Sequence, residues 1–137
     1  MSGLYLLDTN IISGMMRLPE SDAAALYRSR IQAVGDVQIA TSAIVLFELK
    51  FGLQRMPSVR LQRNFDRQMA RIPVLPLDSE VADAYARLRH RLESQGQPIG
   101  PRDTLIAAHA LALKAVLVSA DAEFTRVPGL TVENWLS

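Results

Sequence analysis

Leu4-Tyr5-Leu6-Leu7-Asp8 is a run of four apolar residues closed by an acid. A short apolar run with a polar end is typical of a strand buried in a parallel sheet. Similar runs follow at residues 37–40, 72–75 and 116–119, with a weaker fifth at 130–132. Helical patterns separate these runs, over residues 11–17, 21–34, 42–55, 59–71, 79–95 and 103–114. This alternation predicts an α/β fold, in which helices cover both faces of a short parallel sheet.

Composition limits the class of protein. The chain has 137 residues, 49% of them hydrophobic, and a formal net charge of +1, so we expect one domain over residues 1–137 with a substantial core. It has no cysteine, which excludes a disulfide scaffold and fits a reducing cytoplasm. The sequence shows neither a signal-peptide pattern nor an apolar run long enough to span a bilayer. We therefore expect a cytoplasmic protein with no membrane partner.

Helix starts are marked by residues that favour the N-cap position. Ser21, Ser42, Ser79 and Asp103 are the predicted caps. A loop rich in glycine and proline precedes the last of these helices. The helix over residues 42–55 is strongly apolar, and we expect it to be largely buried.

Four acids stand where acids are scarce. Asp8 and Asp121 each follow an apolar strand, and the carboxyl ends of parallel strands share one edge, where ligands bind. Asp103 opens a helix after the loop, and Glu48 interrupts an apolar helix. Helix capping alone explains any one of the aspartates, and a buried arginine partner explains Glu48. Together the four indicate a site that is assembled by folding.

Clustered carboxylates repel one another, which raises some of their pKa values, and a bound divalent cation relieves that repulsion. Mg²⁺ and Mn²⁺ prefer oxygen ligands, whereas a chain without cysteine or paired histidines is a poor fit for zinc. A divalent cation held by carboxylates is suited to phosphodiester hydrolysis. The residues therefore favour a metal-dependent nuclease.

Two other classes remain open from the residues. One is a phosphotransfer protein, either a receiver domain or a haloacid-dehalogenase-like phosphatase, that uses Asp8 after the first strand. Against it, Asp8-Thr9-Asn10 lacks a second aspartate, and Lys114 precedes a late strand instead of following it. The other is a binding module with a vestigial metal site, which the intact acids disfavour.

Four segments of the chain have the pattern of one known family. They are residues 6–12 (LLDTNII), 41–52 (TSAIVLFELKFG), 98–110 (PIGPRDTLIAAHA) and 117–124 (LVSADAEF), the last followed by 127–130 (VPGL) and 133–135 (ENW). In order and spacing they resemble the motifs of PIN-domain ribonucleases, and the ending resembles that of VapC-type toxins. Each motif alone is weak, but together they are specific and cover essentially the whole chain.

The resemblance implies a fold, an activity and partners. The fold would be a Rossmann-like α/β/α sandwich. The activity would be that of a Mg²⁺- or Mn²⁺-dependent endoribonuclease toxin that cleaves RNA, tRNA being the expected class, and inhibits translation. A VapB-type antitoxin would neutralise it, and the toxin would form homodimers and toxin–antitoxin hetero-oligomers. The family's catalytic, metal-binding acids carry over onto Asp8, Glu48, Asp103 and Asp121.

Smaller polar residues have supporting roles by the same resemblance. Thr9, Asn10, Ser42 and Ser119 offer hydroxyl or amide groups that would orient the carboxylates or the attacking water. Backbone capping is the other explanation for all four.

Arg102 departs from the family pattern, which often has a small or apolar residue just before the third acid. Three roles are open: contact with an RNA phosphate, pairing with an acidic site residue when metal is absent, or exposure to solvent. His109 and Trp135 are predicted to be packed residues, the first hydrogen-bonded and the second anchoring the terminus. Arginines at 55, 60, 63, 67 and 71 mark either a solvated helix face or contacts to RNA.

Overall fold

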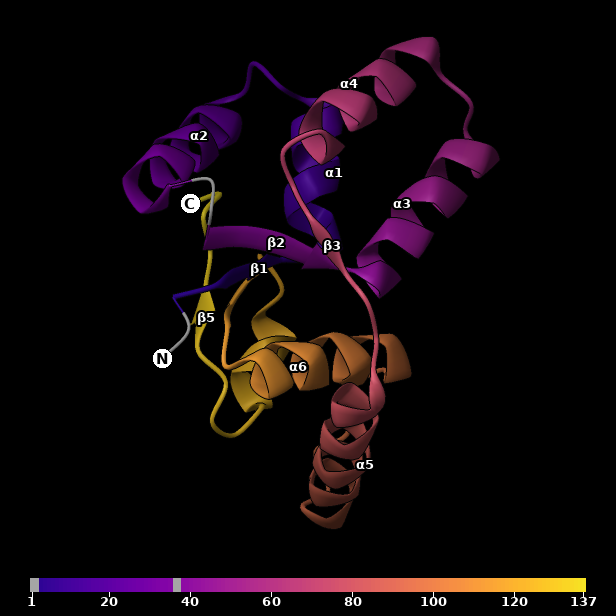
Figure 1. The fold of residues 1–137 in the computed structure, drawn as a ribbon, viewed down its shortest axis with the longest axis vertical. Helices are drawn as coiled ribbons and strands as arrows, with labels where there is room; N and C mark the ends of the chain where they lie inside the picture. Colours follow the sequence, from indigo (N-terminus) through magenta and orange to yellow (C-terminus); the bar gives the residue numbers. More distant parts are fainter. Residues whose placement is uncertain (1–2, 36–37) are drawn as a thin grey trace.

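The computed structural model describes residues 3–35 and 38–137 (Figure 1). Within these residues five strands form one parallel sheet in the order β3-β2-β1-β4-β5. The strands are β1 (Tyr5–Leu7), β2 (Ile39–Ser42), β3 (Val74–Leu75), β4 (Val116–Val118) and β5 (Val132–Glu133). In the central register Leu6 lies between Ala40 and Leu117. The predicted parallel α/β fold is confirmed.

Helices cover both faces of the sheet. They are α1 (Thr9–Arg17), α2 (Asp22–Val34), α3 (Ala43–Arg55), α4 (Val59–Met69), α5 (Ser79–Ser94), α6 (Pro101–Leu113) and the 3₁₀ helix η2 (Ala122–Arg126). Figure 1 shows α1 to α4 on one side of the sheet and α5 and α6 on the other. The chain moves from β1 outward to β3 and then crosses back to β4, so right-handed crossovers place the two groups of helices on opposite faces. None of the helices in the described part of the chain is long and apolar enough to cross a membrane.

The core lies between the sheet and these helices. Leu6 and Leu7 of β1 have no exposed surface. Trp135 is also buried, with its ring centroid 5.2 Å from that of Tyr5 and 6.2 Å from that of Tyr27. The terminal tryptophan therefore anchors the last residues of the chain in the core, as predicted.

Two of the four predicted helix caps are wrong, and the first helix begins at Thr9 instead of residue 11. Asp78, not Ser79, caps α5, and its side chain accepts a hydrogen bond from the backbone N–H of Val81. The last long helix begins at Pro101 with Gly100 before it, so Asp103 is its third residue and not its cap. Proline suits the first helical position because its fixed φ is helical and no N–H is needed there.

The boundaries of the predicted strands shift by one or two residues. The second strand begins at Ile39 and continues through Thr41 and Ser42; Val37, its predicted first residue, lies outside the described residues. Ser119 follows β4 instead of belonging to it. Its backbone N–H still donates to the carbonyl of Glu133 at 3.0 Å.

The prediction that α3 is largely buried is wrong. Val45 and Leu49 are its fully buried residues, while Phe47 and Phe51 have 60% and 62% of their surface exposed. Only the stripe along one side of the helix packs on the sheet and its neighbours. The hydropathy of a segment does not reveal how many of its sides are covered.

Candidate metal centre

The candidate site lies at the carboxyl ends of β1 and β4. The strand order reverses between these two strands, which is the position where open parallel sheets bind ligands. Asp8 follows β1, and Asp121 follows β4 by three residues. The backbone N–H of Asp8 donates to the carbonyl of Val118 at 2.9 Å, so the pairing of the strands continues into the site. The predicted meeting of the strand ends is therefore present.

Asp8 is held from several sides. Its side chain has 2% of its surface exposed. One oxygen, Oδ1, accepts the backbone N–H of Thr9 at 2.7 Å, and Oδ2 accepts the hydroxyl of Ser119 at 2.8 Å. The guanidinium of Arg102 also donates to Oδ1, at 3.2 Å. These contacts fix the orientation of a carboxylate that would otherwise be costly to bury.

Arg102 joins three of the four predicted acids. Its guanidinium donates to Asp8, Glu48 and Asp103, and also to the hydroxyl of Thr9 at 2.8 Å. Burial is the largest single influence on the pKa of Arg102 and lowers it. The hydrogen bond to Glu48 and the charges of the nearby acids raise it and together outweigh burial, so the pKa lies above its usual value. Of the three roles left open, the structure shows the pairing with acids.

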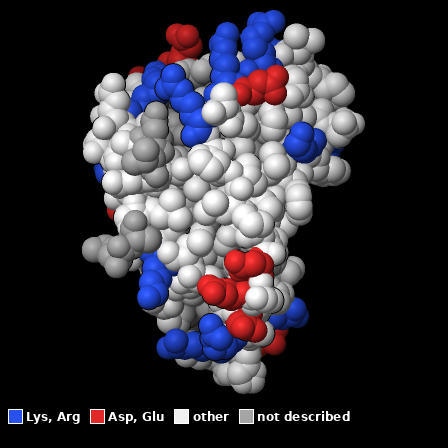
Figure 2. Space-filling view, viewed as in Figure 1, with Lys and Arg blue, Asp and Glu red and all other residues white. Residues whose placement is uncertain are grey.

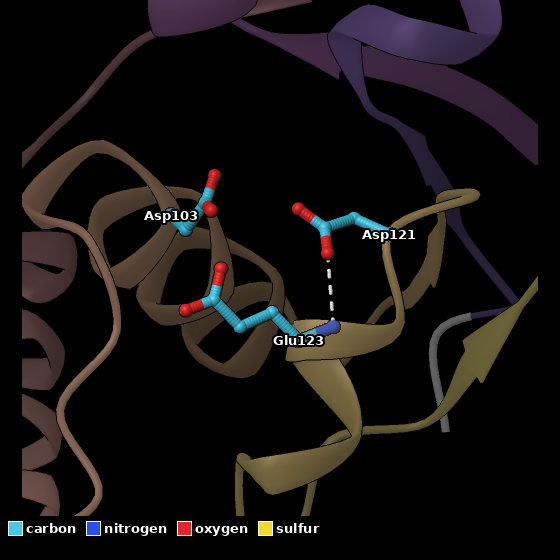
Figure 3. Close-up of side chains that lie close together, drawn as sticks. All are labelled: Asp103, Asp121 and Glu123. Atoms are coloured by element: carbon cyan, nitrogen blue, oxygen red, sulfur yellow. Dashed lines mark hydrogen bonds between the residues drawn. The ribbon is translucent and has the colours of Figure 1, made fainter.

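A second group of carboxylates contains Asp103, Asp121 and Glu123. One oxygen of each lies within 4.8 Å of the others. Figure 3 shows Asp103 reaching from α6 toward the other two, and the N–H of Glu123 donates to Oδ1 of Asp121 at 2.9 Å. Burial raises the pKa of Asp103 above its usual value; Arg102 lowers this pKa, while Asp8, Asp121 and Glu123 raise it.

The donor set fits a hard divalent cation. All of the candidate ligands are carboxylate oxygens, the type that Mg²⁺, Mn²⁺ and Ca²⁺ prefer. Asp103 belongs to both groups, the one gathered by Arg102 and the one with Asp121 and Glu123. Burial is the main cause of the raised pKa of Asp103, the neighbouring acids raise it further, and a bound cation would oppose both effects by favouring the ionised carboxylate.

The smaller polar residues that were predicted to support the acids lie in two different places. Ser119 donates to Asp8 and accepts the backbone N–H of Asp121 at 3.0 Å, and thus joins the two strand ends. Asn10 lies 3.5 Å from the Ser119 hydroxyl through Nδ2, and Thr9 donates to Glu48 at 3.1 Å. Ser42 instead caps α3 through the N–H of Ile44 and lies 2.8 Å from Nδ1 of His109.

Glu123 was not predicted from the sequence. An acid in the first turn of a helix is ordinarily explained by the helix dipole, and Glu123 stands in the first turn of η2. The available signal was its spacing, two residues after Asp121 on a short segment that leaves the sheet edge. Its carboxylate reaches Asp103 only because α6 lies beside that segment.

His109 is packed and hydrogen-bonded, as predicted. It has 1% of its surface exposed. Burial lowers the pKa of His109 below its usual value, and the charge of Asp78 raises it by a smaller amount. Burial therefore favours the neutral form of the imidazole in the folded protein.

This burial predicts a pH dependence of stability. Below the pH at which an unfolded histidine protonates, about 6.5, the unfolded chain binds a proton that His109 does not, so the free energy of unfolding falls as the pH falls. Between pH 7.5 and 5.5 we expect the free energy of unfolding of His109→Gln to fall less than that of the wild type, by at most about 1.4 kcal/mol per pH unit. Urea unfolding at the two pH values measures this. The control is His90→Gln, because His90 is exposed. The prediction would be contradicted if the free energy of unfolding changed with pH equally in His109→Gln and the wild type.

The fold and the site define a class, that of α/β proteins with a cluster of acids at the carboxyl edge of a parallel sheet. Comparisons with known proteins name the family. The PIN domain family model matches residues 5–130. Ribonuclease VapC2 of Rickettsia felis is 35% identical, with 96% of this chain and 98% of the relative covered. The tRNA(fMet)-specific endonuclease VapC of Shigella flexneri is 32% identical, with 96% and 97% covered.

A solved structure has the same fold. The crystal structure of VapBC2 from Rickettsia felis, bound to a DNA fragment from its promoter, matches with a TM-score of 0.85 and 32% identity. The match covers 96% of this chain and 98% of that one. The chain therefore belongs to the PIN-domain family, within its VapC-type ribonucleases, as its motifs indicated.

Proposed function

We propose that this protein is the endoribonuclease toxin of a type II toxin–antitoxin pair, acts in the cytoplasm as a single domain over residues 1–137, and inhibits translation. The observation that carries the proposal is the convergence of Asp8, Glu48, Asp103 and Asp121, from four separate elements, at the switch point of a PIN-domain sheet. We propose tRNA as the substrate class, because a relative that matches over nearly its whole length is a tRNA(fMet)-specific endonuclease.

We propose Mg²⁺ as the cation, with Mn²⁺ able to replace it. Asp8, Asp103 and Asp121 would hold it, Glu48 directly or through water, and Glu123 is a further candidate ligand. When bound, a divalent cation polarises a phosphoryl oxygen and makes water more acidic. The chain's own contribution is orientation, because Ser119 fixes the carboxylate of Asp8 and the backbone of Asp121, and Thr9 fixes Glu48.

Basic side chains support a nucleic-acid substrate. Figure 2 shows Lys and Arg at the end of the molecule that α2 and α4 form, with acids among them, and further Lys and Arg at the α5 end. Helix α4 carries exposed arginines at 60, 63 and 67. Contacts from such side chains to phosphates provide affinity without sequence preference and weaken as salt is added.

We propose a VapB-type antitoxin as the partner, in toxin–antitoxin hetero-oligomers built on a toxin homodimer. The VapBC complex from Rickettsia felis is similar over nearly the whole chain. Ile11, Ile12 and Met15 of α1 belong to the core, whereas Phe47 and Phe51 of α3 are exposed. Exposed large apolar side chains of this kind suit an interaction surface.

Cleavage of cellular RNA by the purified toxin, freed of antitoxin, tests this function. We expect defined RNA ends to appear with Mg²⁺ or Mn²⁺, to disappear with EDTA, and to be absent when purified antitoxin is added first. Sequencing of RNA ends identifies the substrate and the cut. Cleavage that persists in EDTA would contradict the cation, and cleavage that persists in a stable toxin–antitoxin complex would contradict the mode of control.

A further inference from the structure

Arg102 lies at the amino end of a helix, where a positive charge is unfavourable. It is the second residue of α6, after Pro101. The amino end of a helix carries partial positive charge, which favours acids and disfavours arginine. The side chain has 34% of its surface exposed, so two-thirds of it is withdrawn from water. Some other interaction must compensate for this position.

The acids of three elements provide that interaction. The Nε, Nη1 and Nη2 groups of Arg102 donate to Glu48, Asp103 and Asp8, respectively. Glu48 comes from α3, Asp103 from α6 and Asp8 from the end of β1. Every buried side-chain nitrogen and oxygen in the described part of the chain has a hydrogen-bond partner. The acidic site is therefore internally satisfied through a guanidinium supplied by the chain itself.

We propose that Arg102 is the resident cation of this site and competes with the divalent cation for the carboxylates of Asp8, Glu48 and Asp103. The inference rests on the proposed function. An arginine and a metal ion cannot both use the same carboxylate lone pairs, and two cations at contact distance repel each other. A cation that takes the carboxylate positions of Asp8, Glu48 and Asp103 that Arg102 occupies therefore requires the guanidinium to leave, and the one-third of the side chain that faces solvent gives it a route.

Metal affinity is the direct test. The full chain, stripped of metal with a chelator, is titrated with Mn²⁺ by calorimetry as wild type, Arg102→Gln and Arg102→Lys. We expect Arg102→Gln to bind Mn²⁺ about tenfold more tightly than the wild type, because the competing charge is removed. Arg102→Lys should lie between the two, because it keeps the charge without the planar fork that matches carboxylates.

Stability without metal is the second readout. In EDTA we expect Arg102→Gln to melt a few degrees, about 3–5 °C, below the wild type, because its acids lack their counter-charge. Mn²⁺ should then raise the Tm of Arg102→Gln by more than it raises that of the wild type. Arg89→Gln is the matched control: Arg89 pairs with Glu93 on the surface of α5, with both side chains 55% exposed, and its loss should alter neither measurement.

The outcomes separate the inference from the proposed function. If the wild type cleaves RNA with a cation and Arg102→Gln binds Mn²⁺ no more tightly than it does, the competition is wrong and the function stands. If Arg102→Gln binds Mn²⁺ where the wild type does not, the competition is supported in its strongest form. If neither protein binds Mn²⁺, both the cation dependence and the competition are wrong.

Discussion

Asp103→Asn is expected to lower the rate of RNA cleavage by about a thousandfold, which corresponds to about 4 kcal/mol of transition-state stabilisation. The reason is the position of Asp103 between the two groups of acids. Asp103 contacts Arg102 and has an oxygen within 4.8 Å of both Asp121 and Glu123, so it is the carboxylate that the two acidic groups share. Loss of its negative charge weakens every arrangement in which these groups hold one cation. Single-turnover cleavage of a labelled RNA measures the effect.

The same substitution should leave the fold intact. Because the pKa of Asp103 is raised on folding, by burial and by its acidic neighbours, its ionised form destabilises the folded protein at neutral pH. Asparagine removes that cost, so we expect urea unfolding in EDTA to show a stability at least equal to that of the wild type. Asp83→Asn, at an exposed position of α5, is the control for activity. An active Asp103→Asn, or one that loses activity by unfolding, would contradict the assignment.

The meeting of Asp8 and Asp121 could be predicted from the sequence because it follows from one rule. Each acid comes after a short apolar run, and parallel strands end at a common edge. The rule needs neither the packing of helices nor any side-chain detail. The fold class depends on it and agrees with the structure, in which Ser119 joins the side chain of Asp8 to the backbone of Asp121.

Features that depend on contacts between distant elements could not be predicted in the same way. Glu123 becomes a neighbour of Asp103 only because η2 lies beside α6, and its spacing from Asp121 alone does not reveal that contact. The exposed Phe47 and Phe51 show the same limit, since hydropathy does not state which side of α3 other elements cover. The sequence left three roles open for Arg102 because its pairing depends on Glu48 of α3 and Asp8 after β1, which are distant in the chain.

Asp8→Asn is expected to differ from Asp103→Asn by costing stability as well as activity. Asp8 accepts the N–H of Thr9, the hydroxyl of Ser119 and a charged N–H of Arg102, and has 2% of its surface exposed. Asparagine has one acceptor oxygen and places an NH₂ group against one of these donors, so a buried donor loses its partner. We expect the free energy of unfolding to fall by about 2 to 3 kcal/mol.

Capping cannot account for such a loss, which makes the comparison informative. Asp8 is also the N-cap of α1, but asparagine is as good a cap as aspartate. Urea unfolding of the wild type, Asp8→Asn and Asp103→Asn in EDTA, without any cation, isolates the hydrogen bonds of the carboxylate from metal binding. A stability of Asp8→Asn within about 0.5 kcal/mol of the wild type would show that these bonds hold the site without supporting the fold. The expected order instead makes Asp8 the acid that supports both the sheet edge and the chemistry, and Asp103 the acid that serves the chemistry alone.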